Sequence, residues 1–143
     1  MRLTLIPAIH RATHRIGLYI TLLHESGLSQ GEAHILAHLA QSGAATVGEL
    51  HKGLGHKRST LTSILDRLVE RGFVTRETGT QDRRTFVIAL TRTGRPVAAE
   101  TLRHLLELET AATRKFPRHA IDTAIAVLVA IEEAADRRTP ASK

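Results

Sequence analysis

The most constraining feature of the sequence is a short amphipathic segment that runs directly into a pair of strand-like runs. Over residues 57–71, leucine and isoleucine recur at helical spacing, and Gly72 follows as a C-terminal cap. Two β-type runs, at 73–77 and 85–90, flank a polar turn at 78–84 that contains adjacent arginines. A short helix at 46–54 precedes this segment across a turn that contains Gly53 and Gly55. Two short helices joined by a tight glycine turn and followed by a hairpin with a basic tip are the plan of a winged helix-turn-helix. We therefore expect a mainly α-helical fold with a small β-hairpin wing.

Capping signals and glycines divide the rest of the chain into helices. Ser29 with Glu32, and Thr46 with Glu49, match the Ser/Thr-x-x-Glu pattern of a capping box and predict helix starts at both places. Isoleucines at heptad-like spacing predict a long first helix that ends near Gly27. The expected order is a first helix at 7–25, a second at 29–43, a very short strand at 44–45, a third helix at 46–54, the helix and hairpin described above, a helix at 94–115 with Pro96 in its first turn, a last helix from 121 onward and a frayed tail at 136–143.

The two faces of the segment 57–71 differ in chemistry. One face is aliphatic and is expected to be buried: Leu61, Ile64, Leu65 and Leu68. The opposite face is polar and basic: Lys57, Arg58, Ser59, Thr62, Ser63 and Arg67. Hydroxyl and guanidinium groups suit the base edges and phosphates of a DNA major groove, which is wide enough for an α-helix. An ordinary solvated face is the alternative interpretation of the same pattern.

The hairpin loop carries Asp82, Arg83 and Arg84 in succession. Arginine suits the narrow minor groove of DNA, so we expect Arg83 or Arg84 to enter the groove beside the helix. Phosphates repel a carboxylate, and Asp82 is therefore expected to orient one of the arginines. The alternative is that these arginines only add solubilising charge.

The overall charge agrees with a polyanionic partner. Lysine and arginine number 20 against 14 acidic residues, which gives a formal net charge of +6 and a pI of about 10.7. Arginine-rich proteins without such a partner also exist, so charge alone supports DNA binding only weakly.

Several classes of protein are disfavoured. The chain has no cysteine, which excludes disulfides, thiolate metal sites and cysteine redox sensing. No apolar run approaches the length of about 20 residues that spans a membrane, and the N-terminus does not match a signal peptide, so we expect a cytoplasmic protein. A nucleophile–base pair, a phosphate-cradling glycine loop and a carboxylate dyad are not evident, so we expect no catalytic residues and no enzymatic activity.

The stretch from Leu61 to Thr91, LTSILDRLVERGFVTRETGTQDRRTFVIALT, resembles the recognition helix and wing of the MarR family of bacterial transcriptional regulators. The resemblance continues upstream through LSQGEAHILAHLAQSGAATVGELHKGLG and downstream through LTRTGRP, and so covers Leu28 to Pro96. The run DRR before a strand that ends in LT is its most specific part. Departures from the family pattern are the missing polar N-cap before Arg58, and Pro96 where the family usually continues a helix.

The resemblance implies a homodimer that binds a palindromic DNA operator, usually as a repressor, and releases it when a small molecule binds. By position, it assigns DNA contacts to Arg58, Ser59, Thr60, Thr62 and Ser63 of the recognition helix and to Asp82, Arg83 and Arg84 of the wing. The effector pocket of the family lies between the dimerisation helices and the DNA-binding lobe, where isoleucine, leucine, histidine and threonine are expected here. No cofactor is expected apart from such an effector.

Dimerisation is also expected from the residues themselves. The first and last helices carry apolar stripes that a small winged helix cannot bury alone, and a second copy would cover them. We therefore expect a single domain over 1–143, with a winged helix-turn-helix DNA-binding lobe at 28–92 and a helical dimerisation region at 5–26 and 93–136.

Histidines form two pairs at helical i, i+4 spacing, His10 with His14 and His34 with His38. This spacing suits a metal site that has two histidine ligands, but neither pair has an evident third ligand, so solvated or capping histidines are the simpler interpretation. The histidines leave a metal- or pH-responsive regulator as one alternative to a ligand-responsive repressor. A non-specific architectural DNA-binding protein is a second alternative.

Overall fold

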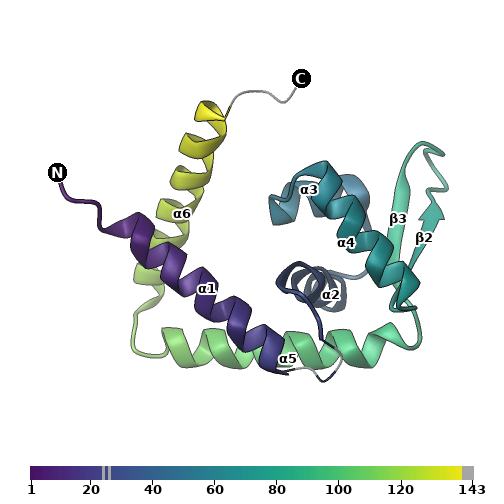
Figure 1. Ribbon diagram of the computed structural model, residues 1–143, viewed down its shortest axis with the longest axis horizontal. Helices are drawn as coiled ribbons and strands as arrows, with labels where there is room; N and C mark the ends of the chain where they lie inside the picture. Colours follow the sequence, from purple (N-terminus) through teal and green to yellow (C-terminus); the bar gives the residue numbers. More distant parts are fainter. Residues whose placement is uncertain (24, 26, 140–143) are drawn as a thin grey trace. The chain divides into compact units, whose positions relative to one another are not determined.

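The computed structural model describes residues 1–23, 25 and 27–139. The elements follow the order α1 (Leu5–Leu23), α2 (Gln30–Ser42), β1 (Ala45–Thr46), α3 (Val47–Leu54), α4 (Arg58–Glu70), β2 (Val74–Thr78), β3 (Phe86–Leu90), α5 (Gly94–Thr113) and α6 (Arg118–Arg138) (Figure 1). The predicted mainly helical fold with a small β wing is confirmed. The chain divides into two compact units, Met1–Leu105 and Leu106–Lys143, with the boundary inside α5.

The predicted helix starts have the expected caps, with one difference. Thr46 and Glu49 form a complete capping box at α3, since each side chain accepts the other residue's backbone N–H at 3.0 Å. At α2, the Ser29 hydroxyl accepts the backbone N–H of Glu32 at 3.2 Å, but the Glu32 carboxylate turns away from the cap to bind arginines of α4. The predicted capping box at Ser29 is therefore only half formed. The long-range ion pairs replace the return bond from Glu32.

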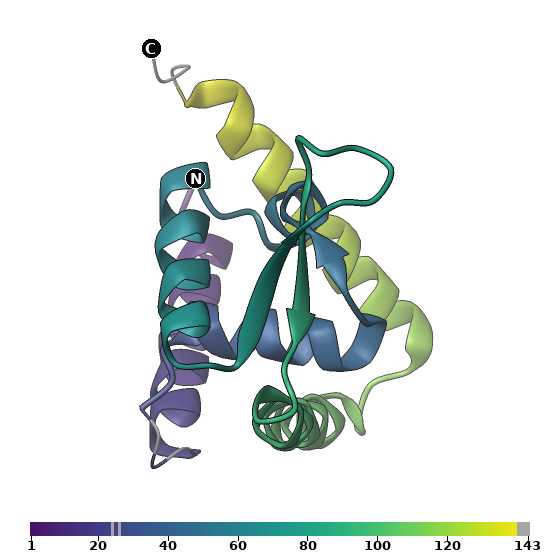
Figure 2. The same cartoon turned by 90° about the vertical axis from the view of Figure 1, so that its right-hand side faces the viewer.

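The sheet of the first unit is antiparallel and has the strand order β1-β3-β2. In the hairpin, Val74 pairs with Leu90 and Thr78 with Phe86, while β1 adds Ala45 against Ile88. The predicted strand at 44–45 therefore lies one residue further on, at Ala45–Thr46, and joins the hairpin as a third strand. Figure 2 shows the loop between β2 and β3 extending beyond the strands.

The core of the first unit joins α2, α4 and β3. Its members include three residues of the predicted aliphatic face of α4, together with residues of α2, α3 and β3, and all are nearly inaccessible to solvent: Leu61, Leu65 and Leu68, and Ile35, Leu36, Leu50 and Ile88. The helix α2 contacts both α4 and β3, which fixes α4 relative to the hairpin. Burial of each of these side chains contributes about 1.5–3 kcal/mol, which is the main stabilisation of so small a lobe.

The junction between α4 and the hairpin is a Schellman motif. Gly72 adopts a left-handed φ of 75°, its N–H donates to the carbonyl of Val69, and the N–H of Phe73 donates to the carbonyl of Leu68. The cap predicted at Gly72 is thus confirmed. It turns the chain directly from α4 into β2.

The start of α5 packs against this same junction. The hydroxyl of Thr91 donates to the carbonyl of Gly72 at 2.6 Å and accepts the N–H of Gly94 at 2.9 Å. A Cβ at Gly94 would lie 1.9 Å from the carbonyl oxygen of Phe73, so only glycine fits there. Pro96 lies in the first turn of α5, as its missing N–H requires.

The second unit contains the end of α5 and the whole of α6. The break at Phe116-Pro117 is confirmed, with Pro117 at the N-cap of α6. Helix α6 continues to Arg138, so the prediction of a frayed tail is wrong for residues 136–138, and positions 140–143 lie outside the described residues. Among residues 1–23, 25 and 27–139, no helix has the length and apolarity that crossing a bilayer requires.

Candidate nucleic-acid interface

The outward face of α4 is the first part of the candidate interface. Every residue that the sequence assigned to this face is exposed, while the aliphatic residues on the other face are buried: Lys57, Arg58, Ser59, Thr60, Thr62, Ser63 and Arg67 outside, and Leu61, Ile64, Leu65 and Leu68 inside. The hydroxyl of Thr62 donates to the carbonyl of Arg58 at 2.9 Å, so its oxygen presents lone pairs and no proton to an outside partner. The face offers hydroxyl oxygens flanked by cations.

The N-terminus of α4 has no side-chain cap. Lys57 occupies the N-cap position and makes no capping hydrogen bond, which agrees with the weak cap seen in the sequence. The first backbone N–H groups of the helix therefore lack a protein partner at the cap, and the positive end of the helix dipole adds to the charge of Lys57 and Arg58. This end of α4 favours an anion.

The wing loop is the second part. Asp82 accepts the backbone N–H of Arg84 at 3.0 Å and its Nε at 3.4 Å, the orienting role predicted for this carboxylate. The side chain of Arg84 is nevertheless 93% exposed, and Arg83 is exposed beside it. Backbone hydrogen bonds from Gly79 to Thr85 and from Thr85 to Asp82 fold the loop on itself. Cationic side chains therefore project from an ordered tip.

An ion pair braces the wing against the helix. Arg76 of β2 lies 2.9 Å from the carboxylate of Asp66 in α4, through its Nη2 atom. Both residues are partly exposed, so the pair contributes little to stability. Its effect is to restrain the direction of the hairpin relative to α4.

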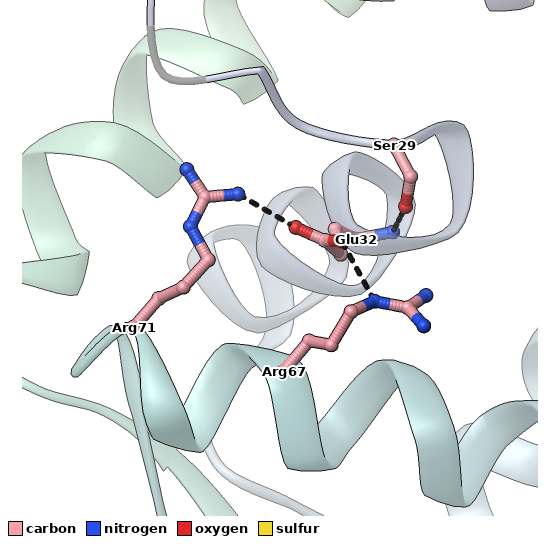
Figure 3. A network of polar contacts seen from close by, with 4 residues as sticks. All are labelled: Ser29, Glu32, Arg67 and Arg71. Carbon is pink, nitrogen blue, oxygen red and sulfur yellow. Dashed lines mark hydrogen bonds and ion pairs between the residues drawn. The ribbon is translucent and has the colours of Figure 1, made fainter.

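A second ion-pair cluster joins α4 to α2. The carboxylate of Glu32 receives the Nε of Arg67 at 3.1 Å and the Nη1 of Arg71 at 2.9 Å (Figure 3). Glu32 is only 4% exposed, which is unusual for a carboxylate that lies in a helix beside a hydrophobic core. Sequence reasoning missed this contact because it assigned Glu32 to the cap of α2. The sequence signal that could have revealed the contact is the position of this glutamate among the residues of α2 that face the core.

The histidine pairs do not gather further ligands. His10 and His14 lie exposed on α1, while His34 and His38 are half-buried on α2. Within the described ranges, no three histidine, aspartate or glutamate side chains come close enough together to hold a metal ion. Burial, and after it the charge of the nearby His56, lowers the pKa of His34.

A hollow of about 390 Å³ lies in the first unit, where the end of α2 meets β3 and the start of α5. Alanines and leucines form most of its lining, and Arg95 supplies a cation at its edge. The hollow is open to solvent. Among the described residues, its lining contains no histidine or threonine.

Comparison with known proteins finds a family match over part of the chain. Residues 28–86 match the model of the MarR family. This range contains α2, β1, α3, α4, β2 and the first residue of β3, together with every recognition-helix and wing residue named above. No curated protein matches the chain in sequence.

Solved structures share the fold over nearly the whole chain. The MarR regulator of Oenococcus oeni PSU-1 aligns with a TM-score of 0.83 at 16% identity, covering 91% of this chain and 99% of that one. MepR of S. aureus in complex with DNA aligns at 0.76 with 19% identity, covering 94% and 99%. BpsR of Bordetella bronchiseptica, whose DNA binding is regulated by 6-hydroxynicotinic acid, aligns at 0.71 with 17% identity, covering 90% and 92%. At these identities the likeness establishes the fold alone.

Proposed function

We propose that this chain, whose residues 28–86 match the MarR family model, is a sequence-specific DNA-binding transcriptional regulator without catalytic activity. A homodimer would bind a palindromic operator, most simply as a repressor. The observation that carries the proposal is the segregation of α4, whose polar, basic face is wholly exposed while its aliphatic face is buried. MepR, which has the same fold, was solved in complex with DNA, and this supports DNA binding by the present chain.

The widths of the two DNA grooves indicate which groove α4 and the wing would each contact. The major groove is about 12 Å wide and accepts an α-helix, whereas the narrow minor groove attracts arginine. In the proposed complex, Arg58 and the hydroxyls of Ser59 and Ser63 meet base edges, and Arg84 enters the adjacent minor groove with Arg83 at its rim. The brace between Arg76 and Asp66 would keep both elements aimed at one duplex.

Dimerisation rests on apolar surface that the chain leaves uncovered. Of the residues of α6, all of which are described, none is buried, although Ile125, Leu128 and Val129 lie on it. Leu18 and Leu22 of α1 are also exposed. A helix gains most of its stability from packing an apolar face, so a second copy is the natural cover. A symmetric dimer would present two α4 helices about 34–36 Å apart, one turn of DNA.

Control by a small molecule is the finer part of the proposal. BpsR, which shares the fold, is regulated by 6-hydroxynicotinic acid, and this supports a small organic effector here. Differential affinity of that effector for the DNA-free state would be required to release the operator.

Selection from a random duplex library, followed by fluorescence anisotropy on the selected site, tests the function. We expect enrichment of a palindrome and affinity that falls steeply with salt. Arg58→Ala should cost about 1–3 kcal/mol and relax preference at one position of each half-site, if the arginine reads a base. Arg84→Ala should weaken binding and reduce the preference for a narrow minor groove.

The matched control is Arg118→Ala, which removes an exposed guanidinium in the second unit that is paired with Asp122. This variant should bind the selected site like the wild-type protein. Uniform affinity for every duplex would instead indicate an architectural DNA-binding protein, and absence of binding at low salt would remove the proposal altogether.

A further inference from the structure

A buried carboxylate lies where a DNA-binding face needs positive charge. The side chain of Glu32 is 6% exposed, and both of its oxygens are occupied by arginines of α4, Arg67 and Arg71. Burying an ionised carboxylate costs several kcal/mol unless it is paired and hydrogen-bonded. The two arginines supply that pairing, and the carboxylate in turn fixes the guanidinium groups that it touches.

The two arginines are held in different ways. Arg71 binds Glu32 through a terminal nitrogen, and its guanidinium carbon lies 5.0 Å from the ring centre of Phe73. Arg67 binds through Nε, on the inner edge of its guanidinium, and 49% of its side chain is exposed. Figure 3 shows the terminal nitrogens of Arg67 turned away from Glu32. These nitrogens carry four N–H donors, and no partner for them occurs among residues 1–23, 25 and 27–139.

The place of Arg67 along α4 distinguishes it from the base-reading residues. Nine residues separate it from Arg58, which is a rise of about 13.5 Å along the helix. The major groove is about 8.5 Å deep, so if α4 enters the groove with its N-terminal end first, its last turn lies near the level of the phosphates. A planar fork of N–H donors with a fixed direction is suited to a phosphate oxygen pair.

We propose that Glu32 is a positioning residue, which holds Arg67 so that the outer edge of its guanidinium grips a backbone phosphate of the duplex. This inference rests on the proposed function and deepens it, because it assigns Arg67 to the phosphate backbone and not to a base. Arg67 would then add affinity without sequence preference. Glu32, although negative, would strengthen the binding of a polyanion by ordering that contact.

The salt dependence of binding separates this role from a merely structural one. Each phosphate contact contributes about 0.9 to the slope of log affinity against log salt. Arg67→Ala should reduce the slope by about 0.9 per protomer, equally on selected and random duplexes. Glu32→Gln should reduce the slope in the same direction and lower the affinity, and it should have no further effect in the Arg67→Ala background. Arg71→Ala, which leaves the bond from Arg67 to Glu32 in place, should leave the slope nearly unchanged.

From net charge alone, Glu32→Gln would be expected to raise the affinity for DNA, because it removes a negative charge. An unchanged slope in Arg67→Ala, or a rise in affinity in Glu32→Gln, would therefore overturn the inference. Circular dichroism and thermal unfolding verify that each variant folds. If Glu32→Gln does not fold, Glu32→Asp retains the charge, shortens the reach by one methylene and should give an intermediate slope. If the wild-type chain binds no DNA, the proposed function itself fails. If the chain binds DNA, and Arg84→Ala weakens the binding while Arg67→Ala and Glu32→Gln do not, the proposed function stands and this inference fails.

Discussion

Substitution of Gly94 tests the junction that joins α4, the wing and α5. An alanine Cβ at this position would meet the backbone of Phe73 at 1.9 Å from oxygen, 2.7 Å from carbon and 2.9 Å from Cα. No side-chain rotation relieves a clash with backbone atoms. The first turn of α5 must therefore move away from the turn that precedes β2, by more than an ångström for a normal contact.

The cost follows from the hydrogen bonds that this movement breaks. Thr91 links Gly72 to Gly94 through its hydroxyl, at 2.6 Å and 2.9 Å, and its own N–H donates to Phe73 at 3.0 Å. Loss of two or three such bonds at about 1 kcal/mol each amounts to about 2–3 kcal/mol. Alanine returns at most about 1 kcal/mol through its higher helix propensity. We expect Gly94→Ala to lower the free energy of unfolding by about 1–2 kcal/mol.

Urea denaturation followed by circular dichroism measures this change. Gly53→Ala is the matched control, because Gly53 also lies in a helix but a Cβ there meets no atom within 4 Å. The control should stabilise the protein by about 0.4–1 kcal/mol, so the two substitutions are expected to have opposite signs. If Gly94→Ala were as stable as the wild-type protein, the described contact between α5 and the β2 turn would be refuted.

Further predictions concern the cap, a histidine and the wing. Thr46→Ala should reduce the free energy of unfolding by about 1 kcal/mol, as measured by urea denaturation. Thr46→Ser keeps a hydroxyl at the cap and should therefore retain most of this stabilisation. The folded-state pKa of His34 is below its ordinary value of 6.5, so the unfolded chain takes up the proton first and stability should fall as the pH drops below that value. His34→Gln should flatten this dependence and His56→Gln should reduce it, in denaturation curves between pH 5 and 7.5; an unaltered slope in His34→Gln would contradict the assignment. Asp82→Ala should weaken operator binding less than Arg84→Ala does, since it frees the arginine without removing it, and anisotropy titrations should rank the variants in that order.

Most of the secondary structure could be predicted from local sequence signals. The capping box at Thr46, the cap at Gly72 and the break at Pro117 each act within a few residues, and each appears where the sequence indicated. The aliphatic face of α4 was predictable for the same reason, because its period of 3.6 residues is a local property. The residues exposed on α4 and on the wing could thus be assigned from the order of amino acids alone.

Contacts between distant residues were not readable in this way. Glu32 pairs with arginines 35 and 39 residues away, and a capping-box interpretation of the same glutamate was equally consistent with the sequence. The brace from Arg76 to Asp66 and the pairing of the short strand at Ala45 with β3 likewise depend on how α2, α4 and the hairpin pack. Such pairings form only once the core has brought the elements together, so no periodicity in one segment can indicate them.

The central claim is that α4 reads the major groove while the wing enters the minor groove of the same duplex. Dimethyl sulfate protection on the selected operator tests it directly, because guanine N7 lies in the major groove and adenine N3 in the minor groove. The account predicts protection of guanine N7 within each half-site and of adenine N3 on its flanks, with the flanking protection lost in Arg84→Ala. Reactive guanines throughout the bound site, or flanking protection that persists in Arg84→Ala, would contradict it.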